Sequence, residues 1–103
     1  RQPKPLNTTL ADMMNPPRLW HHEHWGLLAG YFLASFDRYM RKQYTGAVVF
    51  RKLAGKDREP PLTLLIRASN HQWKHELHAN RWQVMNELNE KMNGQYLQQI
   101  RLI

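Results

Sequence analysis

Apolar residues recur along this chain with two different spacings, which divide it into helices and strands. Between residues 18 and 44 they return at steps of three and four, the spacing of one helical face. The stripe consists of Trp25, Leu28, Phe32, Phe36, Tyr39 and Met40. We therefore expect one long helix over residues 18–44, weakened at Gly26 and Gly30 because glycine is a poor helix former.

Three shorter segments have the composition or alternation of strands. Residues 47–53 are rich in β-branched and aromatic side chains, and residues 62–67 form a second apolar run. The charged, proline-containing segment 54–61 lies between them, which predicts an antiparallel hairpin with a long loop. Residues 96–103 predict a third strand, with Tyr96, Gln98, Ile100 and Leu102 expected on one face.

A second helix is predicted between the hairpin and the last strand. Ser69 and Gln72 have the spacing of a capping box, so the helix is expected to start at Asn70. It is expected to end at Met92 or Asn93, with Gly94 in the left-handed conformation. At 3.6 residues per turn, Trp73, Leu77, Val84 and Leu88 form its core face, whereas His71, His75, His78 and Trp82 lie on the opposite side.

The expected order is short helix, long helix, strand, strand, helix, strand. We expect residues 1–5 to form a basic, proline-containing arm, followed by a short helix that Asn7 can cap and that Pro16 and Pro17 end. Such an order predicts an α+β domain with helices on one face of a small, mostly antiparallel three-stranded sheet. We divide the chain into the N-terminal arm and short helix at 1–17 and a single domain at 18–103.

The chain is strongly basic and contains no cysteine. It has 15 Lys and Arg against 8 Asp and Glu, a net charge of +7. This charge suits a polyanion such as DNA or RNA, although solubility or an acidic protein partner would also account for it. The lack of cysteine excludes disulfides and thiolate zinc sites. No apolar run has the length of a membrane span, so we expect a soluble, cytoplasmic protein without membrane contact.

The basic residues gather in clusters, and a partner surface is expected beside them. An exposed Trp82 near basic side chains would be a stacking plate for bases or an anchor in a protein interface, unless the N-terminal arm or the long loop covers it. The candidate partner-binding residues are His75, His78 and Trp82. The candidate nucleic-acid-binding residues are Arg51, Lys52, Lys56, Arg58, Arg67 and Lys74.

No catalytic or metal chemistry is predicted. His71, His75 and His78 have a spacing that permits metal binding, but the glutamate of a His-Glu-x-x-His motif is missing, which favours exposed histidines on a polar face. His21, His22 and His24 supply no fixed geometry. The serines lack a Gly-x-Ser-x-Gly setting and no glycine-rich phosphate loop occurs. We therefore expect a non-enzymatic protein with no cofactor.

Residues 62–77, with Met85–Asn89, Gly94 and residues 97–101, resemble the DciA family of bacterial replicative-helicase loaders. In that pattern a strand ends in a small polar turn, Trp73 and Leu77 open a helix, and Leu88 and Asn89 come near its end. A glycine follows, and the last strand contains a hydrophobic residue followed, after two intervening residues, by Ile-Arg, here Leu97 to Arg101. The resemblance extends back to Phe36, which takes the place of a usual Trp, while Arg41 replaces a usual Gly.

The resemblance implies a KH-like α+β domain, akin to the N-terminal domain of the initiator DnaA. It implies an adaptor without ATPase activity that contacts the DnaB-type helicase and helps to place it on single-stranded DNA, and it assigns no contact to any residue. The alternative is a KH-like RNA-binding module acting in ribosome or RNA maturation. The Gly-x-x-Gly clamp of such modules is absent, since Gly26 and Gly30 are separated by three residues.

Overall fold

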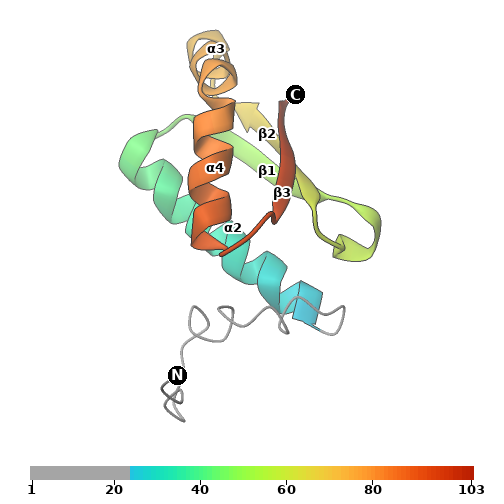
Figure 1. Ribbon diagram of the computed structural model, residues 1–103. Helices are drawn as coiled ribbons and strands as arrows, with labels where there is room; N and C mark the ends of the chain where they lie inside the picture. Colours follow the sequence, from blue (N-terminus) through green and yellow to red (C-terminus); the bar gives the residue numbers. More distant parts are fainter. Residues whose placement is uncertain (1–23) are drawn as a thin grey trace.

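The computed structural model describes residues 24–103, which form three α-helices and one three-stranded sheet. The elements are α2 (Trp25–Gln43), β1 (Val48–Ala54), the 3-10 turn η3 (Lys56–Arg58), β2 (Leu62–Ala68), α3 (His71–Ala79), α4 (Arg81–Lys91) and β3 (Leu97–Leu102). The helices lie on one side of the sheet (Figure 1). The predicted α+β class, with helices on one face, is confirmed.

The sheet is mixed, with the strand order β1-β2-β3. β1 and β2 form the predicted antiparallel hairpin, whereas β3 pairs with β2 in the parallel direction. The expectation of a mostly antiparallel sheet needs this correction. β3 is parallel to β2 because of the connection between them. Two helices carry the chain back to the end of the sheet where β2 begins, and such a crossover joins parallel strands.

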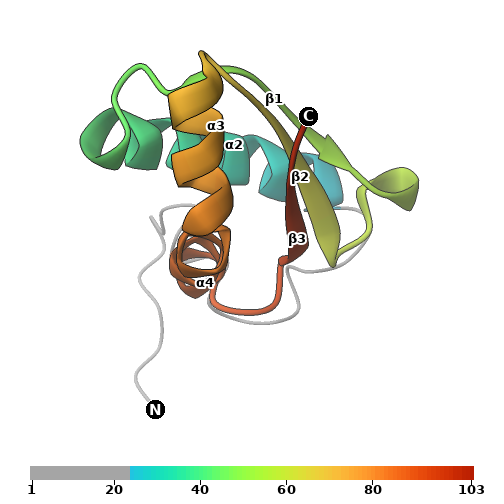
Figure 2. The same ribbon diagram turned by 90° about the horizontal axis from the view of Figure 1, so that it is seen from above.

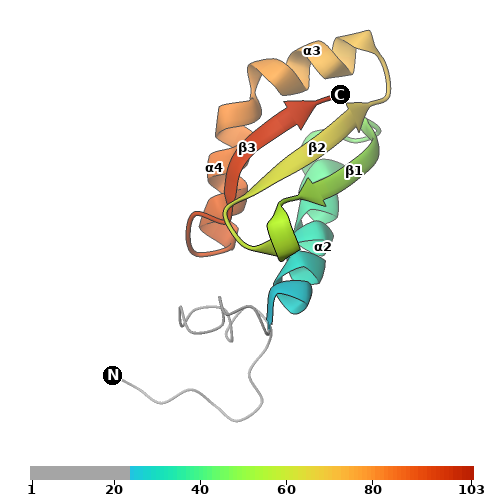
Figure 3. The same cartoon turned by 90° about the vertical axis from the view of Figure 1, so that its right-hand side faces the viewer.

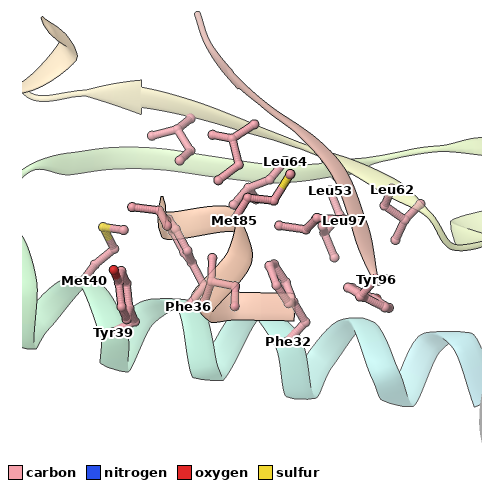
Figure 4. Close-up of a cluster of buried hydrophobic side chains, with 14 of the residues drawn as sticks. Phe32, Phe36, Tyr39, Met40, Leu53, Leu62, Leu64, Met85, Tyr96 and Leu97 are labelled. Atoms are coloured by element: carbon pink, nitrogen blue, oxygen red, sulfur yellow. The ribbon is translucent and has the colours of Figure 1, made fainter. Parts of the chain in front are cut away.

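The core lies between the sheet and α2, with α4 closing one side (Figure 4). On the central strand, Leu62, Leu64 and Ile66 are buried, so alternate positions of β2 face the helices. Phe32 and Phe36 on α2 are fully buried beneath them. Because the side-chain period of a strand is two, the residues between these β2 positions must point to the other face.

The predicted alternation of the last strand is only partly correct. Tyr96, Leu97 and Ile100 are all buried, although an unbroken alternation would place Leu97 opposite the other two. The pairing with β2 shifts by one residue here: Leu62 pairs with Leu97, but Thr63 pairs with Gln99. This irregularity turns Leu97 into the core.

The first helix is continuous through both of its glycines. Within the described residues it begins at Trp25 and ends at Gln43, one residue before the predicted end. The expected start at residue 18 and the short helix before it lie outside the described residues. None of the helices within residues 24–103 has the length and hydropathy needed to cross a membrane.

The second predicted helix is in fact two helices, α3 and α4, which meet at Asn80. Figure 2 shows α4 nearly end-on while α3 is seen from the side. A straight helix over residues 70–92 would be roughly 35 Å long, whereas strands of this length span roughly 20 Å. The bend keeps Leu77 of α3 and Leu88 of α4 buried in the same core.

The ends of these helices differ from the predicted caps. Asn70, rather than Ser69, caps α3: its side-chain oxygen accepts a hydrogen bond from the Trp73 N–H at 2.8 Å. The Ser69 hydroxyl instead donates to the carbonyl of Gly46, which ties the end of β2 to the turn before β1. After α4, Asn93 rather than Gly94 has the left-handed conformation, with φ of 63°.

A buried asparagine joins α4 to the start of β3. The Asn89 Nδ2 donates to the Leu97 carbonyl at 3.0 Å, and the Leu97 N–H donates to Asn89 Oδ1 at 2.7 Å. Asn89 is 8% exposed, so water competes little for these two bonds. The side chain therefore fixes where β3 begins after the crossover.

Replacing Asn89 with leucine should destabilise the fold strongly. The Leu97 N–H and C=O would lose their partner in an apolar setting, at a cost of about 2–4 kcal/mol in the free energy of unfolding. Urea unfolding followed by tryptophan fluorescence measures this. The control is Asn86→Leu at an exposed position of the same helix, expected to change stability by about 0.5 kcal/mol or less. Equal stability of the two variants would contradict the role of Asn89.

Candidate nucleic-acid interface

Strand register places a row of side chains on the face of the sheet opposite the helices. Lys52 of β1 pairs with Leu65 of β2, and Leu65 pairs with Arg101 of β3. Paired residues project to the same face of a sheet. Since Leu64 and Ile66 point into the core, this row points away from it. In Figure 3 the three strands lie in front of the helices, and we call this side the open face.

The open face carries one cation from each strand. These are Lys52, Arg67 and Arg101, and all three are exposed. The strands β1, β2 and β3 contain no Asp or Glu, so no acidic side chain of these strands offsets them. The sheet therefore presents a positive surface, on which phosphates would be favoured.

An exposed aromatic ring accompanies these charges. Phe50 pairs with Arg67 across β1 and β2, and its side chain is 44% exposed. The Arg67 guanidinium carbon lies 5.8 Å from the Phe50 ring centroid, within the range of a cation–π contact. Next to Phe50, Val49 is 64% exposed. In proteins that bind single-stranded nucleic acids, bases stack on exposed aromatic rings while neighbouring cations bind the phosphates.

Arg51 does not belong to the open face, although it is the sequence neighbour of Lys52. It pairs with Ile66 and points toward α2. There its Nε and Nη2 donate to the two carboxylate oxygens of Asp37, at 3.1 and 2.9 Å. The hydrogen bond to Asp37 raises the pKa of Arg51. The charge of Arg51 is thus compensated within the fold, and the structure separates it from Lys52.

The other candidate cations lie apart from the open-face row. Lys56 and Arg58 are in η3, which is part of the connection between β1 and β2, and in this connection Asp57 and Glu59 alternate with them. Lys74 is exposed on α3. Of the six residues predicted from the sequence, the structure therefore brings only Lys52 and Arg67 together on the open face.

The candidate partner residues are divided between two helices. His75 and His78 are exposed on α3, whereas Trp82 lies on α4 and is 59% exposed. Arg81 connects two of them. Its Nη1 donates to the His78 carbonyl at 2.7 Å, and its guanidinium carbon lies 5.8 Å from the Trp82 ring centroid. His78, Arg81 and Trp82 thus form one continuous surface.

No metal centre is found in the part of the chain that the structure describes. Within residues 24–103, no three His, Asp or Glu side chains come close enough together to hold a metal ion. His71, His75 and His78 therefore do not form a cluster of ligands. His21 and His22 lie outside the described residues.

Two residues of the open face were missed by the sequence prediction. Arg101 was not selected because its approach to Lys52 depends on the parallel pairing of β3, which no local pattern reveals. Phe50 was assigned only to the strand as a whole. Alternation within β1 was an available signal, since it separates Phe50 and Lys52 from Arg51.

Comparisons of the chain with protein-family models, curated proteins and solved structures found no match. The kinship with helicase loaders therefore stays a prediction from the residues quoted above. The positive open face is the structural feature that bears most directly on function.

The neighbours Lys52 and Arg51 provide a matched pair of variants. Lys52→Gln should weaken single-stranded DNA binding a few-fold and reduce the slope of log affinity against log salt by about 0.7, the value for one phosphate contact. Arg51→Gln removes the same charge from the helix side and should leave both quantities near those of the wild type. Fluorescence anisotropy with a labelled oligo-dT measures them. Equal effects of the two variants would show that the face carrying the charge does not matter.

Proposed function

We propose that this chain is a non-enzymatic, cytoplasmic adaptor of DNA replication. It holds single-stranded DNA on the open face of its sheet and binds the replicative helicase, whose loading it assists. The observation that carries the DNA-binding part is the open-face row: each strand supplies one cation, the strands supply no acid, and no helix of residues 24–103 covers this side.

The open face suits an extended, flexible polyanion. Adjacent strands lie about 4.8 Å apart, so Lys52 and Arg101 rise from points roughly 10 Å apart across the sheet. Their long side chains can follow phosphates along a strand, releasing counterions. Phe50 and the half-buried Leu65 supply apolar surface on which bases can lie. None of these contacts distinguishes one base from another, so the binding is expected to tolerate any sequence.

The helicase part is supported by the resemblance over residues 36–103. That resemblance implies a KH-like domain, and the described chain has a small α+β fold with the order α-β-β-α-α-β. Leu88 and Asn89, which belong to the resembling pattern, both have structural roles: Leu88 is fully buried and Asn89 holds the start of β3. The pattern thus reflects the fold, and the helicase is its proposed partner.

The alternative of an RNA-binding KH-like module is less well supported. Such modules clamp the nucleic-acid backbone with a Gly-x-x-Gly loop, and the chain contains no such sequence. In this chain α3 and α4 are joined by the single residue Asn80, with φ of −101°, and not by a glycine-containing loop. Parallel titrations with oligo-dT and oligo-U separate the two functions, because an RNA module should prefer the ribose strand.

A triple substitution tests the proposed function. Lys52, Arg67 and Arg101 changed together to glutamine should lower affinity for oligo-dT about tenfold or more at low salt and reduce the salt slope by about 2. The control changes Arg38, Lys42 and Lys91 to glutamine; these residues are exposed on α2 and α4, and the net charge changes equally. Equal losses in both variants would reject the open face as the DNA site.

Co-purification tests the helicase part of the same proposal. After nuclease treatment, the wild type and the triple open-face variant should both retain the replicative helicase, since the DNA face is not required for that contact. A chain that binds oligo-dT through the open face but retains no helicase would be a DNA-binding module without the adaptor role.

A further inference from the structure

A groove separates α4 from the free edge of the sheet. It has a volume of about 450 Å³ and is lined by Arg81, Trp82, Met85, Gln98, Gln99 and Ile100. β3 is an edge strand, so the groove runs along a strand whose outer side pairs with no other strand of the described residues. Figures 1 and 3 both show α4 beside β3. The residues of the open-face row do not line this groove, but Gln99, which neighbours the row, does.

The walls of the groove combine three kinds of chemistry. Trp82 offers an aromatic ring that is more than half exposed. Met85 and Ile100 are 8% and 5% exposed and supply apolar surface from the core. Gln98 and Gln99 are exposed and carry amides, each of which can donate and accept hydrogen bonds.

The positively charged side chain of Arg81 lies next to Trp82 and is fixed by a hydrogen bond. The Arg81 side chain is fixed at one end by its 2.7 Å hydrogen bond to the His78 carbonyl, while its guanidinium carbon lies 5.8 Å from the Trp82 ring centroid. An arginine ordered in this way loses less side-chain entropy when it meets a phosphate. Among the described residues, no Asp or Glu lines the groove, so none of them opposes the charge of Arg81 within it.

This combination fits a nucleobase better than a peptide side chain. A planar ring stacks on tryptophan, its edge needs both donors and acceptors, and the phosphate attached to it needs a cation. The volume lies at the lower end of ligand sites, which span roughly 300–1,000 Å³, and suits one nucleotide rather than a folded segment.

The groove also adjoins the open face. Gln99, which lines the groove, pairs with Thr63 in the register of the open face, and Arg101 follows two residues later on the same strand. A single strand lying across Lys52, Leu65 and Arg101 therefore reaches the edge of β3, beyond which the groove begins.

We propose that the groove between α4 and β3 binds one base of the single-stranded DNA. The base stacks on Trp82, the amides of Gln98 and Gln99 meet its edge, and its phosphate lies against Arg81. This inference rests on the proposed DNA-binding function and adds to it a base-binding pocket at a defined place.

Oligonucleotides with and without bases test the pocket directly. Affinity for oligo-dT and for an abasic oligonucleotide of the same length is measured with the wild type, Trp82→Leu, Trp82→Tyr and Gln72→Ala. Trp82→Leu should bind oligo-dT about tenfold more weakly, the size of one lost stacking contact. Trp82→Tyr should recover most of this loss, because it restores an aromatic ring.

On the abasic strand the Trp82→Leu variant and the wild type should bind equally, because no base remains to stack. The salt slope should be the same for both, since no cation has been removed. Gln72→Ala, an exposed change on α3, should match the wild type throughout.

Three results would overturn the pocket. Trp82→Leu could bind oligo-dT as tightly as the wild type, or it could lose equal affinity for both oligonucleotides. It could also lose the helicase in co-purification while keeping its DNA affinity, which would make the groove a protein contact. If in any of these cases the triple open-face variant still loses DNA, the proposed function survives without the pocket. A wild type that binds no single-stranded DNA would end both proposals.

Discussion

The one-sided burial of the central strand β2 determines how the rest of this structure is arranged. Leu62, Leu64 and Ile66 fill the core, so the residues between them must face away. Because paired residues project to the same face of a sheet, the orientation of β2 also fixes that of both neighbouring strands. Lys52 and Arg101 therefore share a face with Leu65. A slip of one residue in either pairing would turn that strand's outward-facing residues toward the core. The same strand register therefore buries Leu62, Leu64 and Ile66 and exposes the cations on the opposite face.

The crossover from β2 to β3 completes both proposed binding surfaces. Because α3 and α4 bend at Asn80, the chain returns to the beginning of β2, and Asn89 fixes the start of β3 through two buried hydrogen bonds. The parallel placement of β3 adds Arg101 to the open face. It also sets β3 beside α4, which creates the groove that contains Trp82. One connection thus links the proposed phosphate-binding face to the proposed base pocket.

Local patterns in the sequence were enough to predict the strands, most of the helical residues and the α+β class. They could not reveal the direction of β3, the irregular pairing around Gln98 or the bend at Asn80, because these depend on how distant segments fit together. The site shows the same limit. Lys52 and Arg67 were selected for their charge, but Arg51 was grouped with them although Asp37, fourteen positions earlier in the sequence, binds it on the other side. Arg101 entered the site only through strand register.

A titration of the isotopically labelled chain with oligo-dT, followed by amide chemical shifts in nuclear magnetic resonance spectra, tests the central claim most directly. If single-stranded DNA lies on the open face, the largest shift changes will fall on β1, β2 and β3, including Lys52, Leu65 and Arg101, and the exposed turns of α2 around Arg38 and Lys42 will change little. Shift changes concentrated on α2, with the strands unaffected, would contradict the account.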